Sequence, residues 1–144
     1  NIEEKFLLHF TKFLDLQISY FSKMKNVMDI ESVFILLLCG LNTTSQFKDK
    51  EKPISSQHIF YKLRSLNNVL GLNSTSISEI TKVPRTTVLR KIVFLEEIGI
   101  LKKDKFKRYA FDNLNNSIES KKILSTIDSN IKLLGIFFSQ CLET

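Results

Sequence analysis

The chain is poor in the residues on which several classes of protein depend. It has two cysteines, four isolated glycines and two histidines in 144 residues. Two cysteines cannot form the disulfide framework of a small secreted domain. Isolated glycines leave no glycine-rich loop that could bind a nucleotide phosphate. Neither histidine has a cysteine or carboxylate at metal-ligand spacing, so we expect no metal, no cofactor and no enzyme activity.

Long apolar runs are also absent from the sequence. The longest is the seven-residue run 33–39, whereas roughly 20 apolar residues are needed to cross a bilayer. No basic segment is followed by an apolar stretch and a small-residue cleavage site, as in a secretory signal. With 43% hydrophobic and 25% charged residues, the composition is that of a globular protein. We therefore expect a cytoplasmic protein with no membrane segment.

Two helices separated by a very short turn are predicted in the middle of the chain. Ser76 and Glu79 have the spacing of a capping box, which predicts a helix start at Ser76. Ile77 and Ile80 would lie on one face of that helix. Pro84 ends it, because a proline disfavours helical geometry in the residue before it, and Pro84 also suits the first turn of the next helix.

The second helix is predicted over residues 85–97. Val88, Ile92 and Leu95 recur at helical spacing and form its core stripe. Gly99 follows where a helix end tolerates a left-handed residue. The opposite face offers guanidinium and hydroxyl groups from the first two turns, which suits a DNA major groove. These residues are Arg85, Thr86, Leu89 and Arg90, with Thr87 and Lys91 beside them.

The residues after Gly99 predict a short, basic β-hairpin. Its two strands would surround a turn near Asp104 and Lys105, with Lys107, Tyr109 and Phe111 alternating onto one side. Cations in and next to this turn would contact DNA phosphates. They are Lys103, Lys105, Lys107 and Arg108.

The net charge of +6 lies in one segment of the chain. Residues 55–113 hold eleven Lys or Arg against five Asp or Glu, whereas residues 1–54 and 114–144 are each neutral. A lysine-rich surface that is merely solvated would give a more even distribution. The segregation indicates a phosphate-binding surface with neutral flanks.

Helix, turn, helix and basic hairpin together resemble a winged helix-turn-helix domain. Within that class, Thr87–Val88, Arg90 and the segment Leu95–Leu101 are similar to the recognition helix and strand entry of MarR-type bacterial repressors. The similarity covers about residues 55–112. It implies a mainly α fold with a small β-hairpin wing, flanked by N- and C-terminal helices.

The region before the predicted domain contains two further helices and a loop. Residues 2–23 carry phenylalanines near one face, and Asp29 can cap a helix through about Leu41 that is apolar all round and therefore buried. Residues 42–53 are polar and predict a loop. A third helix would start at Ser55 or Ser56 and stop at Gly71. Its core face would be Ile59, Leu63, Leu66 and Leu70.

The chain ends in a long helix after a polar break at 113–117. Ile123, Ile127, Ile131 and Leu134 follow at helical steps. A second apolar side is more than one small domain would cover, and large exposed apolar surfaces usually mark an interface. Residues 2–23 and the last helix would therefore form a homodimer, or else pack within a monomer. The second side consists of Leu124, Leu133, Ile136 and Phe137.

These patterns divide the chain into three parts within one compact unit. Residues 1–54 and 114–144 would serve packing and dimerisation, and residues 55–113 would bind double-stranded DNA. We expect a sequence-specific transcriptional regulator, and the alternative is a winged-helix protein-interaction module without DNA binding. The phenylalanine-rich helices could also enclose a small apolar effector, although core packing explains the same residues.

Overall fold

The computed structural model describes residues 3–47, 69–112 and 117–143. Within these residues there are five α-helices and one two-stranded antiparallel sheet, so the expected mainly helical fold with a small hairpin is confirmed. The helices are α1 (Phe6–Met24), α2 (Ile30–Phe47), α4 (Ser74–Thr81), α5 (Arg85–Glu97) and α6 (Ile118–Leu142), and the strands are β1 (Leu101–Lys103) and β2 (Tyr109–Phe111).

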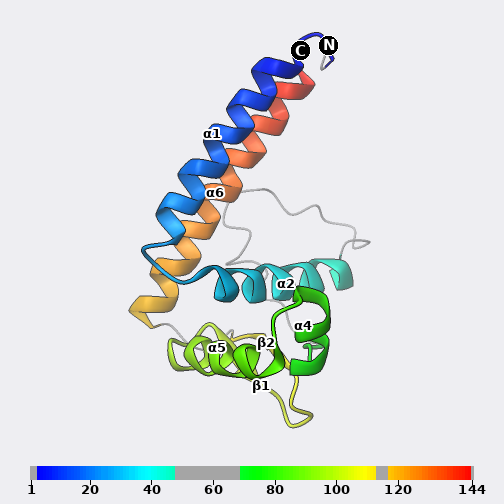
Figure 1. The fold of residues 1–144 in the computed structure, drawn as a ribbon, viewed down its shortest axis with the longest axis vertical. Coiled ribbons are helices and arrows are strands. Elements are labelled where there is room, and N and C mark those ends of the chain that lie inside the picture. The colour runs from blue at the N-terminus through cyan, green and yellow to red at the C-terminus, as the bar shows by residue number, and fades with distance from the viewer. Residues whose placement is uncertain (1–2, 48–68, 113–116, 144) are drawn as a thin grey trace.

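Helices α1 and α6 lie side by side and form a long arm (Figure 1). They run antiparallel, so the start of α1 and the end of α6 lie together at the far end of the arm. The rings of Phe13 and Phe137 contact each other across the pair in a tilted arrangement, with centroids 6.1 Å apart. Helices α2, α4 and α5 and the hairpin gather at the other end.

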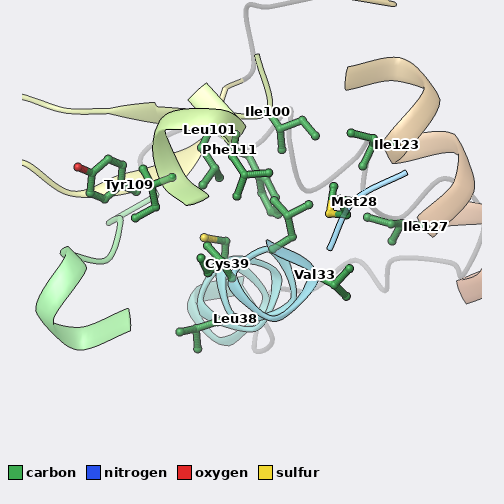
Figure 2. Close-up of a cluster of buried hydrophobic side chains, with 14 of the residues drawn as sticks. Met28, Val33, Leu38, Cys39, Ile100, Leu101, Tyr109, Phe111, Ile123 and Ile127 are labelled. Carbon is green, nitrogen blue, oxygen red and sulfur yellow. The ribbon is translucent and has the colours of Figure 1, made fainter. Parts of the chain in front are cut away.

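The main core lies where this arm joins the other elements. Figure 2 shows side chains from α2, from the hairpin and from the start of α6 gathered in one cluster. Cys39 is buried there as a small apolar residue, and burial raises the pKa of its thiol to about 12. Val88, Ile92 and Leu95 of α5 are fully buried, which confirms the predicted core stripe. Within the described residues, no helix is long and apolar enough to cross a membrane.

Two predictions about α2 were wrong, its end and its burial on all sides. Helix α2 runs to Phe47, so residues 42–47 are helical although the sequence predicted a loop. The side chains of Asn42 and Gln46 donate to the carbonyl oxygen of Leu70, at 2.7 and 2.9 Å. These contacts with a distant residue offset the low helical propensity of Asn, Thr and Ser and extend α2. The helix is also not buried all round, because Phe34 and Leu37 remain exposed.

The start of α4 also differs from the predicted capping box. Asn73 is the N-cap, and its side chain accepts from the backbone N–H of Ser76 at 2.8 Å. Ser76 therefore lies in the first turn of α4, because the asparagine three residues earlier makes the capping bond. Ile77 is buried as predicted, but Ile80 is 58% exposed, so the two do not share a buried face.

The helix predicted between Ser55 and Leu70 lies almost wholly outside the described residues. Val69 and Leu70 are described, and they are not helical. Leu70 is 63% exposed, so its prediction as a core residue was wrong. Gly71 does not follow a helix end here. It lies against the backbone of Tyr109, beside the isolated bridge between Leu72 and Tyr109.

Candidate nucleic-acid interface

A three-residue turn fixes the angle between α4 and α5. Lys82 adopts a left-handed conformation with φ 63°, and its backbone N–H donates to the carbonyl oxygen of Ser78 at 2.9 Å. The Ser78 hydroxyl donates to the carbonyl oxygen of Val83 at 2.6 Å. Val83 is buried and anchors the turn in the core. A left-handed lysine is uncommon, and here two hydrogen bonds and one buried side chain hold the turn in place.

Both ends of α5 are well defined. Pro84 precedes the helix as its N-cap, one residue earlier than the predicted position in its first turn. At the other end Gly99 has φ 84°, and its N–H donates to Glu96 while the N–H of Ile100 donates to Leu95, each at 3.0 Å. This pair of bonds is a Schellman motif, which confirms the predicted glycine stop.

The exposed face of α5 carries Thr86 and Arg90, which are four residues apart and lie one above the other. Thr87 is half-buried at the edge of this face. Val93 continues the face toward the C-terminus and is 52% exposed. The first two turns of α5 therefore offer the Thr86 hydroxyl and the Arg90 guanidinium to solvent, and Arg85 at the start of the helix is exposed as well.

Two of the predicted contact residues are turned toward other elements. The Nε of Arg85 donates to the hydroxyl of Ser74 at the start of α4, at 3.3 Å. The Nζ of Lys91 lies 3.0 Å from Oδ2 of Asp29, just before α2. Both contacts link α5 to its neighbours. Arg85 nevertheless remains exposed, whereas Lys91 would have to leave Asp29 before it could contact a phosphate.

Asp29 is the acidic residue of the ion pair with Lys91. Burial alone would raise its pKa, but the hydrogen bonds from Ser32 and Lys91, and the charge of Lys91, together lower it below its usual value. The Ser32 hydroxyl donates to Oδ1 at 2.6 Å, so each carboxylate oxygen has its own partner. The side chain of Lys91 is 22% exposed and that of Asp29 is 40% exposed.

The hairpin turn is held by the side chain of Asp104. Its Oδ1 accepts from the backbone N–H of Phe106 at 2.8 Å and of Arg108 at 3.0 Å. Lys107 has φ 60° and donates its N–H to the carbonyl oxygen of Asp104. This is a three-residue hairpin loop with a left-handed third position. Lys107 therefore lies in the turn, and its predicted alternation with Tyr109 and Phe111 was wrong.

All four cations predicted for the hairpin are exposed. Lys103 ends β1, Lys105 and Lys107 lie in the turn, and Arg108 precedes β2. Phe106 stands between the two turn lysines and is 68% exposed. In Figure 1 this turn protrudes at the end of the molecule opposite the far end of the arm.

Tyr109 ties the hairpin to the start of α4. Its backbone N–H donates to Leu72 at 2.7 Å and its carbonyl oxygen accepts from the N–H of Leu72 at 3.0 Å. Burial raises the pKa of the Tyr109 phenol; the charge of Glu96 raises it further and that of Arg85 lowers it. Tyr109 therefore stays neutral and serves as a packing residue at the base of the hairpin.

A cavity of about 350 Å³ lies where α1 meets α2. Its volume is at the lower end of the range for small-molecule sites. Its apolar lining is Phe21, Met24, Met28, Ile30 and Val33, and Asp29 lies at its edge. In the part of the chain that is described, no three His, Cys, Asp or Glu residues gather as metal ligands.

Sequence reasoning missed three residues that shape this interface. Asp29 was expected only as a helix cap, because its partner Lys91 is 62 positions away in the chain. Asp104 was expected in a turn, but its two bonds to backbone N–H groups were not. Phe106 was read only as part of the hairpin, and its place in the loop followed from the hydrogen bonds that close the turn.

The chain was compared with models of protein families, with curated proteins and with solved structures. None of the three comparisons found a match. Function must therefore be inferred from the geometry and charge of the interface itself.

Proposed function

We propose that the protein is a sequence-specific double-stranded DNA-binding transcriptional regulator of the bacterial cytoplasm, similar to MarR-type repressors. Helices α4 and α5 would be the helix-turn-helix, and the β1–β2 hairpin would be its wing. The observation that carries this proposal is the shared exposure of Thr86 and Arg90 on α5, next to a hairpin with four exposed cations. Helix α5 would enter the major groove with its first turns, and the wing would lie on the backbone.

Charge supports the same assignment. Residues 69–112 hold nine Lys or Arg and five Asp or Glu. Among the anions, Asp104 is already engaged within the fold, because its carboxylate holds the hairpin turn. The surplus cations would contact phosphates and supply affinity, while Arg90 and Thr86 would select bases.

The arm formed by α1 and α6 would mediate dimerisation. Helix α1 buries one stripe against α6 and leaves a second apolar stripe in water, so a second copy of the chain would cover it. Two α5 helices would then read a palindrome whose half-sites are about 34 Å apart. The exposed stripe is Leu7, Phe10, Leu14, Ile18 and Phe21, with exposed fractions from 44 to 75%.

The cavity between α1 and α2 is where a small apolar effector would bind. Its edge includes Asp29, whose carboxylate reaches Lys91 on α5. A ligand that moved Asp29 would release Lys91 and change how α5 is held. A small apolar effector, which the sequence allowed as an alternative to core packing, would thus have a physical route to the DNA-binding helix.

The experiment is a salt titration of binding to labelled duplexes, followed by alanine variants. Arg90→Ala should lose about 1–3 kcal/mol on a preferred duplex and little on random duplex. Lys103→Ala should weaken both equally and reduce the salt slope by about one. Lys132→Ala removes the same charge from an exposed position on α6 and is the matched control. It should leave both the duplex affinities and the salt slope unchanged.

The rival function is a winged-helix module that binds proteins. It is favoured by Val93 and Phe94, which leave α5 with an exposed apolar part. If the unmodified chain showed no salt-dependent affinity for duplex DNA, the rival would replace the proposed function. Equal losses on both duplexes for Arg90→Ala would remove only its base-reading role.

A further inference from the structure

The hairpin tip carries an aromatic side chain that is not packed in the core. Phe106 is 68% exposed, whereas Tyr109 and Phe111 of the same hairpin are buried. Single exposed apolar residues are normal on protein surfaces. Phe106 differs because it lies in a tight three-residue loop, where polar residues or glycine are the usual occupants.

The backbone beneath Phe106 is held firmly. Oδ1 of Asp104 accepts from the N–H of Phe106 itself and from that of Arg108. The backbone N–H of Asp104 also donates to the carbonyl oxygen of Arg108 at 2.9 Å, which closes the loop. A side chain presented on such a rigid tip loses little conformational entropy when it binds.

The surroundings of the ring indicate the chemistry of the surface it could bind. Lys105 holds its Nζ 5.1 Å from the centroid of the Phe106 ring. Three more exposed cations, Lys103, Lys107 and Arg108, belong to the same hairpin. An apolar ring within a group of cations fits a surface that is anionic at its rims and apolar in its centre. The DNA minor groove has this character, with phosphates along both walls and stacked bases between them.

We propose that Phe106 is a wedge that enters the minor groove next to the α5 contact and partly unstacks one base step there. This inference rests on the proposed function. Lys105, Lys107 and Arg108 would contact the flanking phosphates and keep the ring in the groove. Unstacking bends the duplex and favours deformable pyrimidine–purine steps, so the wedge adds sequence preference at a position without base-edge hydrogen bonds.

The test uses the full chain and a duplex selected from a random pool with the unmodified protein. One set of duplexes carries 2-aminopurine in the flanks, which fluoresces more when unstacked. A second set replaces flanking G·C pairs with inosine·cytosine, which removes the minor-groove amino group and leaves the major groove unchanged. The unmodified protein should raise the 2-aminopurine signal and prefer the inosine duplex.

Phe106→Ala should bind the selected duplex about tenfold more weakly, as expected for a lost base–aromatic contact. It should also lose the fluorescence increase and the inosine preference, and it should keep the salt slope. Phe106→Leu retains an apolar wedge and should recover part of both signals. Because Phe106 is exposed, both variants should melt at the temperature of the unmodified protein.

Three results would overturn the proposal in different ways. Unchanged affinity and fluorescence for Phe106→Ala, with normal salt-dependent binding, would reject the wedge and leave the proposed function intact. Absence of any salt-dependent duplex binding by the unmodified chain would reject the proposed function as well. Phe106-dependent binding to anionic phospholipid vesicles, with no effect on duplexes, would assign the tip to a lipid surface.

Discussion

Gly71 shows how one residue controls the position of the hairpin. A Cβ atom at this position would lie 2.6 Å from the carbonyl oxygen of Tyr109 and less than 3 Å from two other atoms of its backbone. Backbone cannot rotate away as a flexible side chain can. Only a residue without a Cβ atom allows the segment before α4 to approach the hairpin this closely.

We therefore expect Gly71→Ala to destabilise the fold by about 1–3 kcal/mol, as overpacking against rigid neighbours does. The two hydrogen bonds between Leu72 and Tyr109 should be weakened first. Leu70→Ala is the matched control, because Leu70 is 63% exposed and its change should stay within about 0.5 kcal/mol. Urea unfolding followed by circular dichroism measures both, and equal stabilities would contradict the steric explanation.

At the scale of elements, α5 is held from two sides. Lys91 reaches Asp29 before α2, with 3.0 Å between Nζ and Oδ2. At the other end of α5, the Ser117 hydroxyl donates to the carbonyl oxygen of Ile98 at 2.5 Å and also accepts from the N–H of Ser120 as the N-cap of α6. The arm and α2 therefore both fix the orientation of the helix that would enter DNA.

The Asp29–Lys91 pair gives the fold a pH dependence of known sign. Because the pKa of Asp29 is lowered in the folded chain, its contribution is full above about pH 4 and is lost as the pH falls through the folded-state pKa. Both side chains are partly exposed, so we expect Asp29→Asn to cost at most about 1 kcal/mol at pH 7. Unfolding curves from pH 7 to pH 2 should show this difference shrinking to nothing.

Lys91→Met is the matched partner variant. Both changes remove the same pair, so the double variant should lose about as much as either single variant. Additive losses would show that the pair does not contribute to stability. If the free energies of unfolding of Asp29→Asn and the unmodified protein differed by the same amount at every pH, the expected loss of stability at low pH would be contradicted.

At the scale of the whole molecule, the arm leaves apolar surface exposed to water. The stripe on α1 from Leu7 to Phe21 is exposed and apolar, and Leu133 and Ile136 of α6 are also exposed. Burying apolar surface stabilises a protein by about 25 cal/mol for each Å² removed from water, and this exposed surface does not gain that stabilisation. The stripe recurs at steps of three and four residues, as in helices that pair along a seam. Pairing of two arms would cover it.

We expect the protein to be a dimer at micromolar concentration, and Leu14→Glu with Ile18→Glu to make it a folded monomer. These two residues are better probes than Ile131 and Leu134, which are half-buried, so a charge there would disturb the monomer itself. Lys12→Glu, at an exposed polar position of α1, is the control and should remain dimeric. Sedimentation measures the mass against 16.7 kDa for one chain.

Binding to a palindromic duplex should fall with the dimer, because two α5 helices would share one site. The monomeric variant should lose much less affinity for a duplex that carries only one half-site. A well-folded monomer of the unmodified chain that still bound a palindrome tightly would refute the assembly.

The sequence by itself determined the local structure of the middle of the chain. Val88, Ile92 and Leu95 predicted the buried stripe of α5, and Gly99 predicted its end, because helical periodicity and a left-handed stop depend only on neighbouring residues. The hairpin was likewise predicted from its own residues, although only Tyr109 and Phe111 alternate in β2 and Lys107 lies in the turn. The concentration of cations in 55–113 is likewise a property of composition.

Only the tertiary structure decided which of these cations remain available. Lys91 is held by Asp29, whereas Arg85 and Arg90 both stay exposed, although the Nε of Arg85 also donates to Ser74. The length of α2 and the need for Gly71 were also settled by contacts with residues far along the chain, at Leu70 and Tyr109. Such contacts leave no periodic trace in a sequence, because they depend on how the elements pack and not on the spacing within any one of them.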